Sequence, residues 1–321
     1  MDVPAPYTVR AARLEDADAV TAAVNDNCIA LFGEPFTTAE ELLAEWQRPG
    51  RDLAATSRIV ETPDGRLAAC LFLDALQPFS QPLVWGEIVP EHRGHGLGSA
   101  LADWAEAQAR RVILDAPADA QTVLHWPAWV GETGLLELLR ARGFSCVRHF
   151  WRMEVDLASE PEAPAWPPGI SVRTFRRGED ERATYDAVRE AFADHWGDDH
   201  LSFAQWQHER IAGAGSRFDP DVWFLAIDGD EVAGIALCTP EAGHAPELGY
   251  VSTLGVRPAW RRRGLARALL LHVFATFRAR GRPGVSLHVD AANPTGALAL
   301  YAGVGMTALP RFEIWEKPLP R

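Results

Sequence analysis

The sequence predicts an α/β (α+β) protein built from two tandem domains. The chain has 321 residues, which is enough for two domains of ordinary size that each bury a core. Segments with the apolar pattern of strands alternate with segments that have the periodicity of amphipathic helices. A short Arg-x-x-Gly motif also occurs twice, at Arg93 and Arg261, which are 168 residues apart (from 93 to 261). This distance suggests duplication of a whole domain.

Composition and charge exclude several classes of function. With 47% hydrophobic and 23% charged residues, the chain is typical of a globular protein. The net charge of −13 argues against nucleic acid as a partner. The beginning of the chain lacks the charged-then-apolar pattern of a signal peptide, and no apolar run approaches the length that spans a membrane. We therefore expect a cytoplasmic protein with neither a nucleic-acid nor a membrane partner.

The cysteines predict neither a disulfide framework nor a metal centre. They are scattered and form no Cys-x-x-Cys pair, so we expect reduced thiols in the core and no metal site. The four positions are Cys28, Cys70, Cys146 and Cys238.

The elements of the first half follow from hydrophobic periodicity and turn residues. Pro63-Asp64-Gly65 is typical of a turn between two strands. Thr37 or Thr38 suits the cap of a helix with Glu40 and Glu41 in its first turn. In order, we expect a strand at 7–10, a helix at 11–29 and a second helix from the Thr37 or Thr38 cap to Trp46. Strands are then expected at 58–61, 67–73 and 83–89, followed by a strand at 151–157 that closes the first sheet.

A Pro-rich segment at 158–169 is expected to link the two domains, which then cover 1–157 and 170–321. The second half repeats the plan of the first, including a hairpin with an Asp-Gly turn. In order, we expect a strand at 170–175, helices at 180–192 and 203–212, the hairpin strands at 222–227 and 231–238, a strand at 249–256, a helix after Gly264, and a strand at 286–290.

The most specific pattern lies between Glu247 and Tyr301. A strand ends at Pro258, and a basic turn of three arginines and Gly264 then leads into an amphipathic helix. Such a turn gathers free backbone N–H groups at the positive end of the helix dipole, and the small residues Gly264 and Ala266 let a phosphate approach. The pattern is therefore that of a pyrophosphate site, although it matches neither a Walker loop nor a dinucleotide fingerprint.

Two motifs in this region resemble those of the GNAT acetyltransferase superfamily. The Arg-x-x-Gly-x-Ala pattern at 261–266, after Leu-Gly-Val-x-Pro at 254–258, resembles its acyl-CoA pyrophosphate motif. The segment at 287–306, in which Asn293 precedes Tyr301, resembles the motif that follows it. The resemblance implies two tandem GNAT-like domains, each a mixed, mostly antiparallel central sheet flanked by helices. It also implies acetyl-CoA as cofactor.

The resemblance places the cofactor along the strand end and the turn. Backbone N–H groups near Leu254 would polarise the thioester carbonyl, where the strand splays from its neighbour. Asn293-Pro294 equally fits the turn at a helix start. The implied cofactor-binding residues are Leu254, Gly255, Val256, Arg261, Arg262, Arg263, Gly264, Leu265, Ala266, Arg267 and Asn293.

Tyr301 is the expected general acid, because a phenol with a pKa near 10 is protonated at neutral pH and can give its proton to a thiolate. The alternative is a core tyrosine on an amphipathic helix. Many GNAT enzymes carry a glutamate base four residues before the Leu of Leu-Gly-Val, where this chain has Tyr250. His288 or Glu247 is the substitute we name, with Asp290 or a water held by Ser252 and Thr253 as further options. The base stays unassigned.

The acceptor, a small-molecule amine, is expected near a polar and aromatic stretch of the second half. Its aspartates suit a cationic amine, although a solvated acidic loop is an equally good reading. The residues expected to contact the substrate are Asp194, His195 and Trp196, with Asp198 and Asp199 nearby and Tyr250 and Ser252 on the strand.

The first half looks like a degenerate copy. It repeats the turn, but Leu139 stands where Tyr301 stands, and Asn293 has no counterpart. The turn either still binds CoA or serves as scaffold, since it is also a stable way to begin a helix. A second cofactor site would comprise Ile88, Arg93, Gly94, Gly96, Gly98 and Ser99.

The expected function is direct transfer of an acetyl group from acetyl-CoA to a primary amine of a small molecule, with the chemistry in the C-terminal domain. The tandem arrangement also resembles the mycothiol synthase family, which acetylates a cysteinyl pseudo-disaccharide. Tyr250 and His288 stand where that family has a substrate-contacting glutamate and a tyrosine. A protein that only binds or senses acyl-CoA, or that acetylates protein tails, is a further alternative. The protein is expected to be a monomer or a homodimer.

Overall fold

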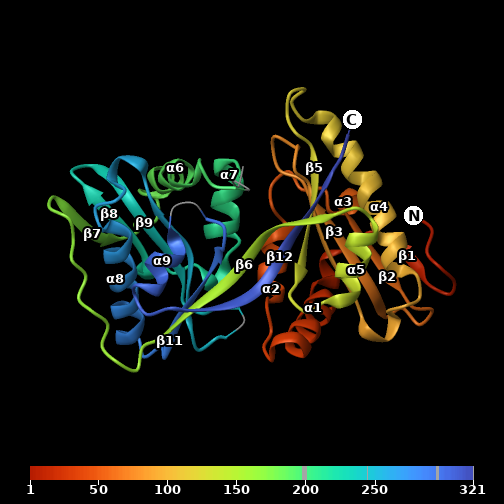
Figure 1. The fold of residues 1–321 in the computed structure, drawn as a ribbon, viewed down its shortest axis with the longest axis horizontal. Helices are drawn as coiled ribbons and strands as arrows, with labels where there is room; N and C mark the ends of the chain where they lie inside the picture. Colours follow the sequence, from red (N-terminus) through yellow and green to blue (C-terminus); the bar gives the residue numbers. More distant parts are fainter. Residues whose placement is uncertain (197–200, 244, 294–295, 321) are drawn as a thin grey trace. The chain divides into compact units, whose positions relative to one another are not determined.

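The computed structural model describes residues 1–196, 201–243, 245–293 and 296–320. The chain forms two compact units, and strands and helices contribute to each of them (Figure 1). The N-terminal unit comprises Met1–His149 and Arg311–Arg321, and the C-terminal unit comprises Phe150–Pro310. No helix in the described part of the chain combines the length and the apolarity needed to cross a membrane.

The sheet of the N-terminal unit is antiparallel except between β4 and β5, which are parallel. Two apolar clusters pack against it, one with α4 and α5 and the other with α1 and α2. In spatial order the strands are β1 (Thr8–Arg10), β2 (Ser57–Glu61), β3 (Leu67–Asp74), β4 (Leu83–Ile88), β5 (Val123–Trp129) and β12 (Thr307–Pro318). The helices are α1 (Ala17–Phe32), α2 (Ala39–Trp46), α3 (Leu53–Thr56), α4 (Leu97–Val112) and α5 (Thr133–Ala141), with short turns η1 (Leu14–Asp16), η2 (Pro90–His92) and η3 (Ile113–Asp115).

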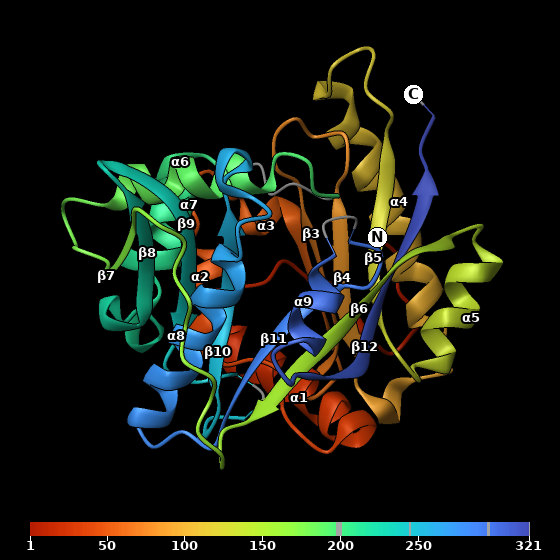
Figure 2. The same ribbon diagram turned by 60° about the vertical axis from the view of Figure 1, so that its left-hand side comes forward.

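The C-terminal unit repeats this plan, and its parallel pair is β10 with β11. Helix α8 packs along β9, β10 and β11, as Figure 2 shows. In spatial order the strands are β6 (Ser145–Asp156), β11 (Gly284–Asp290), β10 (Gly249–Val256), β9 (Glu231–Thr239), β8 (Trp223–Asp228) and β7 (Ile170–Thr174). The helices are α6 (Glu181–Phe192), α7 (Phe203–Gln207), α8 (Leu265–Ala279) and α9 (Ala297–Ala302), with η4 (His208–Ala212), η5 (Gly215–Arg217), η6 (Pro220–Val222) and η7 (Pro258–Trp260).

The two halves exchange their last strands. Residues 150–156 of β6 pair with β11 in the C-terminal unit, and residues 312–318 of β12 pair with β5 in the N-terminal unit. The strand expected at 151–157 therefore closes the second sheet, and the expectation that it closes the first was wrong. Apolar alternation identifies a strand but not its partner, because pairing is decided by contacts distant in sequence. The compact units accordingly differ from the ranges 1–157 and 170–321 at the last strand of each half.

The duplication is visible in matching ion pairs. Arg10 holds both carboxylate oxygens of Asp16 at 2.7 Å, and Arg173 holds both oxygens of Asp180 at 2.6 and 2.7 Å. In each unit this fork joins the first strand to the residue just before its first long helix. The tandem α/β fold with mixed, mostly antiparallel sheets is thus confirmed.

The Pro-rich segment at 158–169 lies along α8, within the C-terminal unit. Glu162 accepts two hydrogen bonds from Arg267, at 3.1 and 2.8 Å. The Trp166 ring lies edge-on to His272 at 5.8 Å between centroids, and the Pro168 carbonyl accepts a bond from Arg263 at 3.4 Å. This segment is therefore anchored by the same helix whose N-terminus follows the basic turn.

Candidate active site

Strand β10 contains a β-bulge whose extra residue is Ser252. Val251 pairs with Cys238, and Thr253 pairs with Leu237, so Ser252 has no partner of its own in the ladder. Its hydroxyl instead donates to the Leu237 carbonyl at 2.9 Å. A bulge bends a strand and reverses which face the following side chains point to.

The surroundings of two glycines of β10 show this reversal of the faces. A Cβ on Gly249 would lie 2.5 Å from the Phe277 ring of α8, whereas a Cβ on Gly255 would lie 3.0 Å from Ala191 and Phe192 of α6. Residues six apart in a regular strand share one face, so the bulge accounts for the difference. The two helices therefore cover opposite faces of β10.

Beyond its first two residues, β10 separates from β11. Within the described residues the two strands pair at Gly249↔Val285 and Tyr250↔Ser286, and the rest of β10 pairs with β9 alone. The backbone at 254–256 thus has one edge free of ladder hydrogen bonds, which is the splay expected there. In the N-terminal unit β4 and β5 pair at Leu83↔His125, but β4 pairs with β3 without a register shift from Leu83 to Ile88.

The basic turn after η7 has the geometry of an anion site. Arg262 and Gly264 both have left-handed backbone conformations, with φ of 62° and 84°. Gly264 is the N-cap of α8, and glycine has no side chain that could cap the first N–H groups of the helix. These groups and the helix dipole favour a bound anion. The N-terminal unit repeats the turn with Gly94 and Gly96 at φ of 79° and 81°.

Arg261 holds the turn in place. Its guanidinium donates to the carbonyls of Val256 and Ala191 at 3.2 and 3.0 Å and to Asp194 at 3.1 Å. In the N-terminal unit Arg93 donates in the same way to the Ile88 carbonyl, five residues earlier, at 3.0 Å. Both arginines thus tie the turn to the strand end, so the first arginine of the motif positions the turn.

The remaining arginines of the motif lie closer to solvent. Arg262 and Arg263 are exposed. Arg263 faces Asp228 at 3.9 Å, and Arg267 is paired with Glu162 as described above. Leu265 is buried beneath the helix start, next to the half-buried Ala266. Positive charge at this turn is therefore presented mainly by Arg262 and Arg263.

Tyr301 lies on α9 and is only 7% exposed. Burial, with a smaller contribution from the charge of Tyr250, raises the pKa of Tyr301 to about 12. The Tyr301 carbonyl accepts a hydrogen bond from Met306 N at 3.1 Å, and the Leu139 carbonyl accepts one from Phe144 N at 3.0 Å. The matching pattern places Leu139 and Tyr301 at equivalent positions.

Tyr250 and His288 form a hydrogen-bonded pair between β10 and β11. The Tyr250 hydroxyl lies 3.0 Å from Nδ1 of His288. Burial and, to a lesser extent, the charge of Arg152 lower the pKa of His288 to about 4. The imidazole is therefore neutral at pH 7. The structure therefore brings Tyr250 and His288 together, at the end of the paired part of β10 and β11.

Other expected residues are placed less favourably. Glu247 is exposed and lies three residues before Tyr250, on the turn that precedes β10. The Ser252 hydroxyl already donates to the Leu237 carbonyl within the bulge. Asn293 is half-buried in the turn after β11, where its N–H donates to the Asp290 carbonyl at 3.1 Å. Glu247 thus lies outside strand β10, on an exposed turn.

The expected acceptor stretch follows α6. Asp194 is exposed and pairs with Arg261 at 3.1 Å. The His195 ring lies edge-on to Phe192 at 4.7 Å between centroids, and Trp196 is half-buried. Asp198 and Asp199 lie outside the described residues.

The turn of the N-terminal unit is covered by the beginning of the chain. A Cβ on Gly96 would lie 3.4 Å from the ring of Pro4. The Tyr7 hydroxyl lies 3.1 Å from Nδ1 of His92. Gly98 packs near Leu138 and Ile88, and the Ser99 carbonyl accepts from Arg142 at 3.0 Å.

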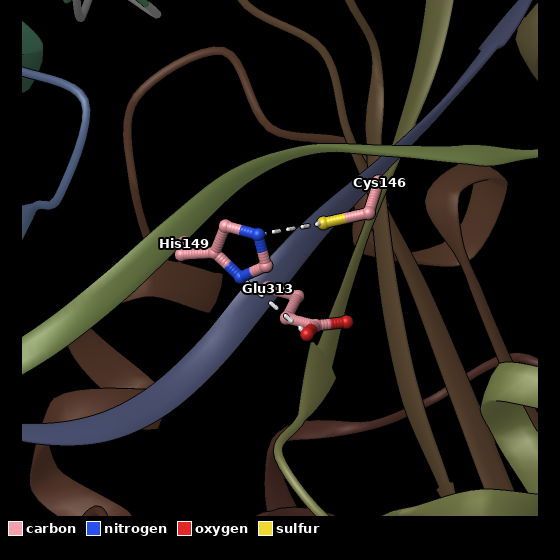
Figure 3. Close-up of side chains that lie close together, drawn as sticks. All are labelled: Cys146, His149 and Glu313. Carbon is pink, nitrogen blue, oxygen red and sulfur yellow. Dashed lines mark hydrogen bonds and ion pairs between the residues drawn. The ribbon is translucent and has the colours of Figure 1, made fainter.

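One further group of side chains was missed by the sequence analysis (Figure 3). Cys146 Sγ lies 3.7 Å from Nε2 of His149, and Nδ1 of His149 lies 3.4 Å from Glu313. The two contacts use opposite nitrogens of one ring, so the groups form a chain, whereas a metal ion takes one nitrogen from each imidazole. Burial raises the pKa of the Cys146 thiol. Residues three apart in a strand normally point to opposite faces, and Glu313 comes from β12, so no sequence signal marked this group.

The structure thus combines a bulged strand that leaves its parallel neighbour, a left-handed basic turn before a helix, and a buried tyrosine on α9. These features agree with the acyl-CoA-dependent acyltransferases to which the motifs point. A model of the Acetyltransferase (GNAT) family matches residues 182–306. The chain belongs to the GNAT acetyltransferase family, and it is an acyltransferase.

Similar proteins extend this relationship over nearly the whole chain. A mycothiol acetyltransferase of Thermobispora bispora is 34% identical, covering 75% of this chain and 77% of that protein. One of Streptomyces bingchenggensis is 30% identical, covering 92% and 94%. The crystal structure of a GCN5-related N-acetyltransferase from Sphaerobacter thermophilus is 35% identical, with a TM-score of 0.76 over 99% of this chain and 97% of that one. A tandem GNAT protein from the clavulanic acid biosynthesis pathway, 18% identical with a TM-score of 0.70, shares the fold over 98% and 99%.

Proposed function

We propose that the protein transfers an acetyl group directly from acetyl-CoA to a primary amine of a small molecule, with the chemistry in the C-terminal unit. The observation that carries this assignment is the contrast between Tyr301 and Leu139 at equivalent positions. A phenol can interact with a leaving thiolate, and a leucine cannot. The bulge at Ser252 also favours the C-terminal unit as the place of the chemistry, since the matching strand β4 of the N-terminal unit has a regular register.

The cofactor is held by the turn and by the open edge of β10. The pyrophosphate binds the N–H groups at the start of α8, with Arg262 and Arg263 alongside. The backbone N–H groups of 254–256 that face the opening polarise the thioester carbonyl as negative charge develops on its oxygen. Arg261 contributes by keeping the turn against the strand end.

Tyr301 stabilises the leaving thiolate. Its pKa of about 12 keeps it protonated throughout the physiological range. An ordinary thiol has a pKa near 8.5, so complete proton transfer from Tyr301 to the thiolate would cost about 5 kcal/mol. We therefore assign Tyr301 as a hydrogen-bond donor to the sulfur; Tyr301 keeps its own proton while the thiolate leaves and is protonated by water.

The Tyr250–His288 pair accepts the proton that the acceptor amine loses. A neutral imidazole with a pKa of about 4 is a weak base toward a free ammonium group. The amine nitrogen becomes far more acidic once its bond to the acetyl carbon forms. At that moment its proton passes to the Tyr250 oxygen while the phenol proton moves to Nδ1 of His288. The amine must therefore enter uncharged.

The relatives give a second candidate acceptor. Two of them, covered over three quarters of their length or more, are mycothiol acetyltransferases, which supports a cysteinyl pseudo-disaccharide as the amine. The Tyr250–His288 pair argues for a different acceptor, because that family has a glutamate and a tyrosine at these positions.

The test is a calorimetric titration of acetyl-CoA followed by a free-thiol assay across a panel of amines that includes the cysteinyl pseudo-disaccharide. One binding site with amine-dependent thiol release supports chemistry in a single unit. Release with the cysteinyl compound alone supports the second candidate. If acetyl-CoA does not bind, the proposal is wrong, and two equivalent sites would show that the N-terminal turn also holds cofactor.

A further inference from the structure

The N-terminal unit contains a cavity of about 310 Å³ that the acetyl-transfer mechanism does not use. It lies between helices α1 and α2 and strands β4, β5 and β12. Its size is in the range of sites for small organic molecules. The wall combines aromatic rings with carboxylates. The aromatic residues are Phe36, Trp85, Trp129 and Phe312, and the carboxylates are Glu41, Glu45, Glu87 and Glu132.

The aromatic wall is fixed by ring-to-ring packing. Trp129 lies edge-on to Phe36 at 4.5 Å and to Phe312 at 6.0 Å between centroids. Trp85 is stacked at 4.5 Å on Phe72, which is fully buried behind it. Perpendicular rings present both faces and edges to the cavity, and aromatic faces attract cations.

Two of the carboxylates already have ordinary structural roles. Glu41 accepts from the Thr38 N–H at 3.1 Å and from the Thr37 hydroxyl at 2.9 Å, which caps α2. Glu45 pairs with Arg51 at 2.8 Å. These two residues add negative charge at the rim but are held by other groups.

The other two carboxylates, Glu87 and Glu132, both line the cavity. Glu87 is 5% exposed and accepts from Asn27 at 2.8 Å, Arg93 at 3.0 Å and its neighbour's backbone N–H. Glu132 accepts from the Trp129 N–H at 3.3 Å. Burial and the charge of Glu87 raise the pKa of Glu132 to about 7, although Arg93 acts in the opposite direction. The residues that line the cavity include four carboxylates and no cationic side chain, so the cavity itself offers no positive charge to Glu132.

We propose that this cavity binds a small organic cation, with its ammonium group against Glu132 and the ring of Trp129 and its apolar body between Phe36 and Trp85. Charge pairing at a half-buried carboxylate and contact with aromatic faces both favour a cation over a neutral molecule. Anions, including the phosphates of CoA, are disfavoured by Glu87 and Glu132. The binding step is separate from acetyl transfer and does not depend on it.

The probe is benzyltrimethylammonium, titrated into the full-length protein by calorimetry. It has no N–H, so it cannot be acetylated, and binding is measured apart from any turnover. Benzenesulfonate carries the same ring with the opposite charge and is the ligand control. We expect saturable binding of the cation at one site and no binding of the sulfonate.

The matched variants are Glu132→Gln, which removes the carboxylate that would face the ammonium group, and Glu137→Gln, which removes a carboxylate from an exposed position on α5. We expect Glu132→Gln to weaken binding about tenfold or more and Glu137→Gln to leave it unchanged. If Glu132→Gln fails to fold, Phe36→Leu should weaken binding in the same direction by removing one ring. Equal affinity in both glutamine variants, equal binding of the sulfonate, or loss of binding in Tyr301→Phe would overturn the proposal.

Discussion

The hydroxyl of Tyr250 lies 3.0 Å from Nδ1 of His288 and joins β10 to β11 at the place where their pairing ends. Tyr250 is the last residue of β10 that pairs with β11, and His288 lies two residues beyond its partner Ser286. The side-chain bond therefore closes the vertex of the opening between the strands. It couples the geometry of the opening to the protonation state of one imidazole.

Acid should loosen this vertex. The pKa of His288 is lowered from 6.5 to about 4 in the folded protein, so the unfolded chain takes up the proton first as the pH falls. Folding stability should thus drop between pH 6.5 and pH 4, by at most about 3 kcal/mol. His288→Gln should remove this part of the pH dependence. Urea unfolding at pH 7 and pH 4.5 measures it.

The control is His95→Gln, which replaces an exposed imidazole in the N-terminal unit. It should retain the full loss of stability between the two pH values. If His288→Gln and the parent protein lose the same stability on acidification, the neutral buried imidazole is not the cause.

Tyr301→Phe should reduce turnover by about 10²-fold or more, since it removes the hydrogen bond to the leaving thiolate. Acetyl-CoA affinity should change little, because the turn and the strand edge remain. Steady-state kinetics and calorimetry separate the two quantities. Tyr7→Phe, which alters a tyrosine of the N-terminal unit, is the control. Unchanged turnover in Tyr301→Phe would remove the tyrosine from the mechanism.

Arg262→Gly should move stability and affinity in opposite directions. Arg262 has a φ of 62°, whereas the equivalent residue of the other unit is Gly94. Glycine relieves the left-handed strain but gains freedom in the unfolded chain, so the net stabilisation should be about 0.5–1 kcal/mol. Loss of the guanidinium should weaken acetyl-CoA binding. Arg262→Lys keeps the charge and should keep the affinity, so weakening by lysine and glycine alike would contradict a charge effect.

Arg263→Glu should weaken acetyl-CoA binding about tenfold or more, because it places a negative charge beside the pyrophosphate. The structure supplies a matched control at the same place in the N-terminal turn, His95→Glu. This second change should leave both affinity and turnover unaltered. If it weakens binding equally, the N-terminal turn holds cofactor as well.

The sequence predicted the elements of the fold because hydrophobic periods and turn residues are local. It also predicted the repeated turn, and the matching left-handed residues Gly96 and Gly264 confirm that both copies adopt one conformation. The exchange of β6 and β12 was not predictable, since strands of similar pattern can pair with either sheet. The pairing is visible only in the contacts that each strand makes.

The candidate site also contains residues whose roles the sequence predicted and residues whose roles depend on contacts distant in sequence. Tyr301 could be proposed from the motif that resembles the GNAT superfamily, but the roles of Arg261 and Ser252 could not. Arg261 follows the motif yet bonds to the strand end, and Ser252 reads as a polar strand residue yet fills a bulge. The aromatic cavity around Glu132 also escaped notice, because its walls come from α1, α2, β4, β5 and β12, which lie far apart in the sequence.

A rise in pH from 4.5 to 7 should lower the folding stability of the protein through Glu132 in the N-terminal cavity. The pKa of Glu132 rises from 4.5 to about 7 on folding, because burial and Glu87 disfavour its charge more than Arg93 and Asn27 support it. The folded protein then holds a proton that the unfolded chain releases, so stability should fall as the pH rises from 4.5 to 7, by about 3 kcal/mol. Glu132→Gln cannot ionise and should be the more stable protein at pH 8 by up to this amount, with little difference at pH 4. Chemical unfolding of both proteins at the two pH values measures the effect, and Glu137→Gln should behave like the parent. A Glu132→Gln variant no more stable than the parent at pH 8 would mean that the carboxylate is already balanced by its neighbours.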